Sequence, residues 1–356
     1  MTNRYIRHTS LSSFGVQGQT KLSKASILIV GLGGLGIPAA QYLNAMGVGE
    51  IGLVENDIIA LHNLQRQVLY SENDIGKSKL DVTLHKLQEQ NQSTAFKTFD
   101  AYLTPENALE IIAQFDLVID ATDNFESRYL INDACVILDK PFVYGALHAF
   151  EGQISVFNFE EGPTYRCLFP VQPGIDEIPN CDDNGVLGIL PGIIGSLQAL
   201  EAVKVITGIG AVLSGKLLLF DGLSQTTQKI NFNLNPINKG ISHLKESYHA
   251  TSCTNIKNIS AEEFIEISER ESIQIIDVRS DTEFGNGYWK GAKNIPLSDI
   301  DKRLEEFDFN DEIYLLCQSG IRSQKAYELL TTLRPSAKLI NVAGGMNNLE
   351  LHVGSN

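Results

Sequence analysis

The stretch that decides the fold is Ser26-Ile-Leu-Ile-Val-Gly31-Leu-Gly33-Gly34-Leu-Gly36, an apolar run that leads directly into a glycine-rich turn. The β-branched run is typical of a buried parallel strand, and the segment after the turn has the composition of a helix. In this context the glycines match the dinucleotide-binding fingerprint, because they let the backbone approach a phosphate at a helix N-terminus. Glu55 follows about 20 residues further on, where a carboxylate would bind ribose hydroxyls.

Strands and helices alternate along the chain around this turn. We expect strands at 26–31, 51–54, 116–120, 141–145, 153–158 and 216–220, and helices at 77–90, 125–138 and 192–207. This alternation predicts an α/β fold with a mainly parallel sheet of the Rossmann type over residues 1–232. The polar, turn-rich stretch 233–255 is interpreted as a linker. Strands expected at 273–277, 312–317 and 338–342 then predict a second, smaller α/β domain at 256–356.

Composition limits the classes of partner. The 356 residues include 28 Lys and Arg against 43 Asp and Glu, a net charge of −15, which disfavours nucleic acid and anionic membrane surfaces. Five dispersed cysteines, an odd number, indicate a reducing compartment, and the first residues lack the apolar core of a signal peptide. The longest uncharged run, Asn184–Leu200, is 17 residues long and contains Pro191, so we expect no membrane span. A cytoplasmic protein is predicted.

Three further groups of residues favour a triphosphate over a nicotinamide cofactor. They are Asn63-Leu-Gln-Arg66, Lys77-Ser-Lys79 and Asp120-Ala-Thr-Asp123-Asn124. A triphosphate needs cations for its charge and a carboxylate to hold Mg²⁺, whereas a dehydrogenase needs neither. Each residue alone has a structural explanation, such as a solvated helix charge for Arg66 or a helix N-cap for Asp123. Together they indicate ATP and Mg²⁺.

These motifs, with Arg4-Tyr-Ile-Arg7 and the stretch 185–201, resemble the adenylating enzymes of the ubiquitin-activating superfamily. The most similar members are the molybdopterin-synthase and thiamine-thiazole sulfur-carrier adenylyltransferases, and the resemblance covers residues 1–232. It implies that Arg66 and Lys79 stabilise the phosphates, and that Arg7 reaches the triphosphate from the partner subunit of a homodimer. Glu55 stands where the family has Asp. The implied ATP and Mg²⁺ residues are Gly31, Gly33, Gly34, Gly36, Glu55, Asp57, Asn63, Arg66, Lys79, Asp123 and Asn124, with Asp123 on the metal.

Members of that family usually carry two Cys-x-x-Cys pairs on a structural zinc. Here Thr164-Tyr-Arg-Cys167 stands at the first pair and Thr251-Ser-Cys253 near the second. A closed zinc site needs four ligands, so we expect the zinc to be absent, although His249 could join the two thiolates. Cys135, inside an apolar helix, is expected to be a small core residue.

Cys181 lies in the polar stretch Pro179-Asn-Cys181-Asp-Asp-Asn. A free cysteine in such a loop is uncommon unless it is used. The resemblance matches it to the family's catalytic-loop cysteine, which takes part in sulfur transfer or in a thioester with the carrier. Asp182 and Asp183 would raise the pKa of its thiol, so it would need activation from elsewhere.

Cys317 is the other candidate nucleophile. The strand ending at Cys317 runs through Gln318-Ser-Gly320-Ile-Arg322 into a helix expected at 324–333, so backbone N–H groups and Arg322 would stabilise a thiolate or persulfide anion. A buried structural cysteine is the alternative. Together with Asp277-Val-Arg279, Glu283-Phe284 and Gly344-Gly345, this loop resembles a rhodanese over residues 256–349, which implies a persulfide on Cys317. In such domains Asp277 and Arg279 are more often structural.

The fusion predicts one reaction. Adenylation makes a carboxylate electrophilic and a persulfide supplies sulfur, so the pair would convert the C-terminal carboxylate of a ubiquitin-like carrier ending in Gly-Gly into a thiocarboxylate. The molybdopterin-synthase small subunit is the first candidate carrier, a thiamine-thiazole or tRNA-thiolation carrier the alternative, and a cysteine desulfurase or another persulfide donor would supply the sulfur. An NAD-dependent oxidoreductase, a non-catalytic sulfur-relay scaffold and a ligase for another carboxylate stay open.

Overall fold

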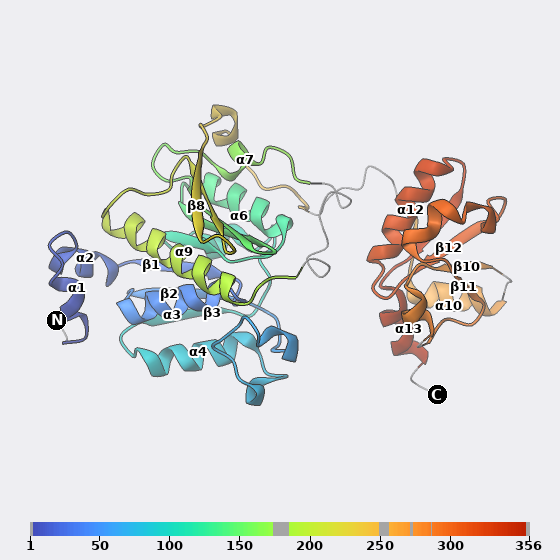
Figure 1. Ribbon diagram of the computed structural model, residues 1–356, viewed down its shortest axis with the longest axis horizontal. Coiled ribbons are helices and arrows are strands. Elements are labelled where there is room, and N and C mark those ends of the chain that lie inside the picture. Colours follow the sequence, from blue (N-terminus) through green and yellow to red (C-terminus); the bar gives the residue numbers. More distant parts are fainter. Residues whose placement is uncertain (1–2, 174–184, 249–255, 271–272, 286, 354–356) are drawn as a thin grey trace. The chain divides into compact units, whose positions relative to one another are not determined.

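The computed structural model describes residues 3–173, 185–248, 256–270, 273–285 and 287–353 (Figure 1). They divide into two compact units, the first built mainly from residues 1–172 and 179–249 and the second mainly from residues 250–356. Each unit has its own sheet and its own buried core.

The first unit is built on an eight-stranded sheet of order β3-β2-β1-β4-β5-β6-β7-β8. The five strands from β3 to β5 are parallel and the last three are antiparallel, which confirms the mainly parallel α/β fold. The strands are β1 (Ser26–Val30), β2 (Glu50–Val54), β3 (Ala95–Phe99), β4 (Leu117–Asp120), β5 (Phe142–His148), β6 (Glu151–Phe157), β7 (Lys216–Asp221) and β8 (Thr226–Asn231).

Alternate residues of β1 enter two different cores. Ile27 and Ile29 pack with α3 (Gly36–Met46), α4 (Lys79–Gln90) and α9 (Ile189–Thr207), whereas Leu28 and Val30 pack with α5 (Ala108–Ile112), α6 (Phe125–Ile137) and α7 (Tyr165–Leu168). A sheet covered by helices on both faces explains why its strands have continuous apolar sequences. Figure 1 shows α3, α4 and α9 together on one side of this sheet.

Helix α9 is longer than the sequence predicted. It begins at Ile189 rather than at 192, because Pro191 lies in its first turn, where a missing N–H breaks no helical hydrogen bond. It ends at Gly208 as expected, with φ +78°. By length and composition, α9 is the one described helix that could span a membrane, with a mean hydropathy of 1.5. However, half of it is buried, and it packs on β5 and β6 as a core helix does.

The second unit is a five-stranded parallel sheet of order β11-β10-β12-β13-β9. Its strands β10 (Gln274–Asp277), β12 (Glu312–Leu316) and β13 (Lys338–Val342) lie where the sequence predicted them. The other elements are β9 (Asn258–Ile259), α10 (Ala261–Arg270), α11 (Asp281–Gly285), β11 (Ala292–Asn294), α12 (Ile321–Leu333) and α13 (Gly345–Val353). This small α/β unit confirms the second part of the predicted fold class.

Part of the stretch interpreted as a linker packs against the first unit. A short 3-10 helix, η5 (Pro236–Lys239), follows β8, and Lys239 donates a hydrogen bond to the Asn158 side chain at 2.7 Å. Further along, the buried Tyr248 hydroxyl donates to Asp133 at 2.8 Å. The described part of this segment therefore follows the surface of the first unit as far as residue 248.

Candidate functional site

The turn between β1 and α3 has the shape that binds a phosphate. Gly31 has φ +94°, and a Cβ at Gly36 would lie 1.9 Å from the Gly31 carbonyl oxygen, so neither position accepts a side chain. Within the part of the chain that the structure describes, nothing accepts a hydrogen bond from the N–H groups of Gly33 or Gly34. These N–H groups precede the eleven-residue helix α3, where an anion is stabilised by the helix N-terminus.

Glu55, at the end of β2, is held against this turn. Its Oε2 accepts from the N–H of Leu32 at 2.8 Å, and its Oε1 accepts from the N–H groups of Asn56 and Asp57 at 3.0 and 3.1 Å. An ionised carboxylate has about four acceptor positions, so about one is left for a ribose hydroxyl. Glu55, which is longer than the aspartate of the family, therefore holds the turn in place and still has an acceptor position for the ribose-binding role that the sequence predicted.

The segment from Leu61 to Gln67 covers the glycine turn. A Cβ at Gly34 would lie 3.5 Å from the Arg66 side chain, and one at Gly33 would lie 3.7 Å from Gln67. Buried Asn63 orders this segment, since its Oδ1 accepts from the N–H of Ala60 at 3.0 Å. Arg66 itself donates to the His62 carbonyl at 3.2 Å. The structure thus brings Arg66 to the turn and gives Asn63 a local structural role.

Lys79 is the first residue of α4 and is only 5% exposed. Its ammonium group donates to Asp57 Oδ2 at 2.5 Å, and its N–H donates to the Asp57 carbonyl at 3.0 Å. Burial raises the pKa of Asp57, but the Lys79 hydrogen bond and the Ile58 N–H outweigh burial and hold the pKa below its usual value. Asp57 therefore keeps a cation ready beside Glu55, at the edge of the glycine turn.

The end of β4 closes the other side of the turn. The Ala121 carbonyl oxygen would lie 2.9 Å from a Cβ at Gly31. Asp123 follows it on the surface, where its carboxylate is available to a metal, and the Asn124 side chain caps α6 by accepting from the N–H of Ser127 at 2.8 Å. Asp123 thus fits the magnesium role, whereas Asn124 serves the helix that follows.

Sequence reasoning missed a buried polar cluster beneath this edge. Asp120 is completely buried, and its Oδ2 has no hydrogen-bond partner, whereas its Oδ1 accepts from the Thr122 hydroxyl at 2.6 Å. Burial raises the pKa of Asp120 despite the nearby Arg128 charge. Gln198 of α9 donates to the Asp120 carbonyl at 2.7 Å. The signal was present in the sequence, because Asp120 opens the same motif as Asp123.

Arg7 lies away from the glycine turn. It belongs to α1 (Ile6–Thr9), and the preceding Tyr5 hydroxyl touches Asn91, just after α4, at 3.2 Å. A Cβ at Gly47, just after α3, would lie 2.3 Å from the same hydroxyl. The glycine turn and Lys79 lie at the opposite ends of α3 and α4, which are about 16–18 Å long. The structure therefore does not bring Arg7 to the site of its own chain.

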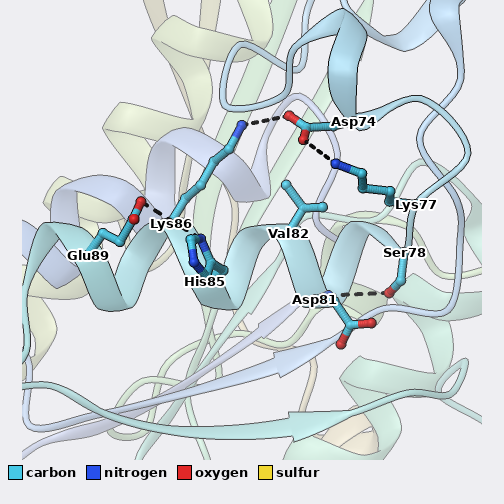
Figure 2. A pocket seen from close by; sticks show the side chains of 8 residues that line it. All are labelled: Asp74, Lys77, Ser78, Asp81, Val82, His85, Lys86 and Glu89. Atoms are coloured by element: carbon cyan, nitrogen blue, oxygen red, sulfur yellow. Dashed lines mark hydrogen bonds and ion pairs between the residues drawn. The ribbon is translucent and has the colours of Figure 1, made fainter.

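A hollow along α4 is lined by none of the candidate nucleotide-binding residues described above (Figure 2). Asp74 accepts from Lys86 at 2.8 Å and Lys77 at 3.3 Å, and these hydrogen bonds lower the pKa of Asp74. Asp81, His85 and Glu89 also line this hollow. Because three carboxylates stand against two lysines and the lining includes no glycine turn, this hollow does not fit a triphosphate.

At the position where the family carries its zinc, three residues form hydrogen bonds to one thiol. Cys167 Sγ accepts hydrogen bonds from the Asn235 N–H at 3.3 Å, the Asn238 side chain at 3.4 Å and the Thr164 N–H at 3.4 Å. Burial raises the pKa of the Cys167 thiol, but these hydrogen bonds outweigh it and lower the pKa. Thr164 and the two asparagines are not zinc ligands. No group of three His, Cys, Asp or Glu in the described ranges could hold a metal, and Cys253 and His249 lie outside them.

In the second unit, Cys317 is completely buried directly after β12. Its Sγ accepts from the N–H groups of Gly320 at 3.2 Å and Ser323 at 3.3 Å. Gly320 has φ +86°, which turns the loop back so that its N–H points at the sulfur. The structure therefore places Cys317 in the nest of N–H groups that the sequence predicted, at the start of α12.

Charged pairs hold this loop from two sides. Arg322 donates to both carboxylate oxygens of Glu283, at 2.6 and 2.7 Å. Arg279 and Asp277 are both buried, with 2.7 Å between Arg279 Nη2 and Asp277 Oδ2. Arg279 also donates to the Gln318 side chain at 3.0 Å. Asp277 and Arg279 thus form a buried ion pair, and Arg279 also reaches the loop.

Of the two cysteines not yet discussed, the structure describes Cys135 but not Cys181. Cys135 is buried in α6, and burial raises the pKa of its thiol, so the prediction of a small core residue is confirmed. Cys181 lies outside the described residues, and its role stays a prediction.

The geometry defines an α/β nucleotide-binding domain followed by a domain built around a cysteine-bearing anion loop. The chain belongs to the ThiF family, whose profile matches residues 5–239, and it carries a rhodanese-like domain at residues 260–352. The family resemblance noted in the sequence is thereby confirmed.

Two relatives are similar to this protein over nearly the whole chain. It is 40% identical to "Adenylyltransferase and sulfurtransferase MOCS3" of Culex quinquefasciatus, over 93% of this chain and 82% of that protein. It is also 40% identical to "Probable molybdopterin-synthase adenylyltransferase" of Porphyra purpurea, over 99% of this chain and 94% of that protein. The crystal structure of E. coli MccB with ATP has a TM-score of 0.59 at 23% identity, over 68% of this chain and 74% of that one, a likeness of fold.

Proposed function

We propose that this protein adenylates the C-terminal glycine carboxylate of a ubiquitin-like sulfur carrier and replaces one of its oxygens with sulfur. The observation that carries the proposal is the presence, in one chain, of the Gly31–Gly36 turn with two cations and of the Cys317 loop. The names of the relatives support both activities, and the Porphyra name favours the molybdopterin-synthase small subunit as carrier.

In the first step, the carrier carboxylate oxygen attacks the α-phosphorus of ATP, and pyrophosphate leaves. The Gly33 and Gly34 N–H groups bind phosphate oxygens, Glu55 binds the ribose, and Arg66 and Lys79 offset the charge of the leaving pyrophosphate. Lys79 exchanges its bond to Asp57 for one to phosphate. Asp123 would hold Mg²⁺, which supplies further positive charge to the phosphates when bound.

In the second step, the terminal sulfur of a Cys317 persulfide attacks the acyl carbon and AMP leaves, which gives an acyl disulfide. The Cys181 thiolate then attacks Sγ of Cys317, so the carrier departs as a thiocarboxylate and a Cys181–Cys317 disulfide remains. A cellular dithiol reduces that disulfide, and a persulfide donor such as a cysteine desulfurase reloads Cys317. This cycle requires free thiols, so we place the protein in the reducing cytoplasm.

The active form is a homodimer in this proposal. Arg7 is separated from the glycine turn of its own chain by the length of α3 and α4. A second copy would supply Arg7 to the triphosphate, where one more fixed cation stabilises the transition state.

Two assays separate the steps. Carrier-dependent exchange of labelled pyrophosphate into ATP reports adenylation, and it should survive Cys317→Ser and Cys181→Ala. Release of thiocarboxylated carrier should be lost in both variants, with the acyl disulfide accumulating only in Cys181→Ala. Absence of exchange with every Gly-Gly carrier would refute the adenylation step, and full turnover of Cys181→Ala would refute the role of Cys181.

A further inference from the structure

The charge of Arg322 is already neutralised in the folded chain. Its guanidinium group forms two parallel hydrogen bonds to Glu283, at 2.6 and 2.7 Å, the strongest geometry available to an arginine and a carboxylate. Glu283 is itself fixed, because Ser280 donates to its Oε2 through the hydroxyl at 2.7 Å and the N–H at 3.1 Å. The pair is therefore a built feature of the loop rather than a chance surface contact.

The second cation at the loop, Arg279, is also paired with a carboxylate. Arg279 donates to both oxygens of Asp277 and to Gln318, and its side chain is 3% exposed. Among the described residues, two arginines contact this loop, and each forms an ion pair with one carboxylate. What faces Cys317 Sγ is the Gly320 and Ser323 N–H groups and the Ser323 hydroxyl.

We propose that Glu283 is a specificity-determining residue, which neutralises Arg322 and thereby selects an organic persulfide over a dianionic sulfur donor such as thiosulfate. The inference rests on the proposed function of Cys317 as the persulfide carrier. A dianion that approaches the Cys317 thiolate meets one like charge and no unpaired cation in this loop, whereas an organic persulfide brings less charge.

The two loading reactions balance in the same way. The Cys317 thiolate attacks the sulfane sulfur, a Cys317 S–S bond forms and the donor S–S bond breaks. Thiosulfate releases sulfite, whereas an organic persulfide releases its thiolate. In each case Cys317 becomes a persulfide anion, which the same N–H groups can accept. The donors differ chiefly in the charge that the loop must accommodate.

The test uses the full chain, thiosulfate or cysteine persulfide as donor, and cyanide as acceptor, with thiocyanate as the product measured. The quantity compared is the kcat/KM ratio of thiosulfate to cysteine persulfide. Glu283→Gln keeps the length of the side chain and removes its charge, so Arg322 becomes available and the ratio should rise about tenfold or more. Glu283→Asp keeps the charge and should leave the ratio low.

Glu306→Gln is the matched control, because Glu306 forms a similar two-bond pair with Arg303 on the same unit, at 2.5 and 2.9 Å. It should not change the ratio. An unchanged ratio in Glu283→Gln, or an equal rise in Glu306→Gln, would overturn the inference. Equal use of both donors by the wild-type chain would also overturn it, even if Glu283→Gln does not fold. Failure of both donors to load Cys317 would instead refute the proposed function.

Discussion

The replacement Lys79→Met tests the nucleotide site most sharply. Methionine keeps an unbranched apolar stem of similar length in a position that is 5% exposed, and it removes only the ammonium group. If Lys79 stabilises the leaving pyrophosphate, one charge-assisted contact is lost where the charge develops. Such a loss lowers the rate about 10²- to 10³-fold, or about 2.7–4 kcal/mol.

The cost to stability should be much smaller. The partner carboxylate of Asp57 is 50% exposed, so it can be hydrated once Lys79 is gone. An ion pair with one such solvated member contributes at most about 1 kcal/mol. The variant should therefore fold normally and fail in carrier-dependent pyrophosphate exchange.

Lys86→Met is the matched control on the same helix. Lys86 also pairs with one carboxylate, Asp74 at 2.8 Å, but it lies in the hollow of Figure 2 rather than at the glycine turn. Asp74 keeps Lys77 as a partner in this variant. We expect exchange within about threefold of wild type. The reasoning is refuted if Lys79→Met keeps its exchange activity or if Lys86→Met loses as much.

Three more outcomes follow from the same contacts. Arg7→Ala and Lys79→Met, each inactive in exchange, should regain activity when mixed, because a hybrid dimer contains one complete site; no recovery after subunit exchange would contradict a role of Arg7 in the partner. Arg322 lowers the pKa of Glu283 to about 2, so the pair should stabilise the second unit above about pH 4.5 and less as the pH falls toward 2. Because Glu283 is 37% exposed, we expect the pair to contribute only about 1 kcal/mol to the free energy of unfolding. Urea unfolding of wild type and Glu283→Gln, followed by the fluorescence of the single tryptophan, Trp289, measures this contribution. A difference between the two proteins that grows on acidification would contradict the prediction. Metal analysis should find the purified chain without zinc, because the Cys167 thiol is hydrogen-bonded to groups that are not zinc ligands; stoichiometric zinc in the wild type would contradict this arrangement around Cys167.

The local sequence was sufficient to predict a structural feature where a single strand, turn or helix start determines its geometry. The Gly31–Gly36 turn, the Cys317 loop and most strands follow from an apolar run that ends at a turn or at a helix start, and the structure has them where they were expected. The edge strands β3, β8, β9 and β11 were missed, because they are short or largely exposed and lack an apolar pattern.

Contacts between distant segments could not be predicted from the sequence. Asn235 and Asn238 complete the surroundings of Cys167 about 70 residues away, and nothing in either segment specifies that meeting. Likewise, the pairing of Glu283 with Arg322 depends on how α11 and α12 meet beside the loop. The sequence predicted no separate role for Asp120, because its complete burial depends on the packing around β4.

In the proposed function, one chain activates a carboxylate and then delivers sulfur to it. The intact mass of a Gly-Gly-ending carrier should be measured after incubation with this protein, Mg·ATP and a persulfide donor. We expect a mass gain equal to the replacement of one oxygen by sulfur, and no gain with Cys317→Ser. A carrier of unchanged mass, with pyrophosphate exchange still present, would contradict the coupling of the two domains in one reaction.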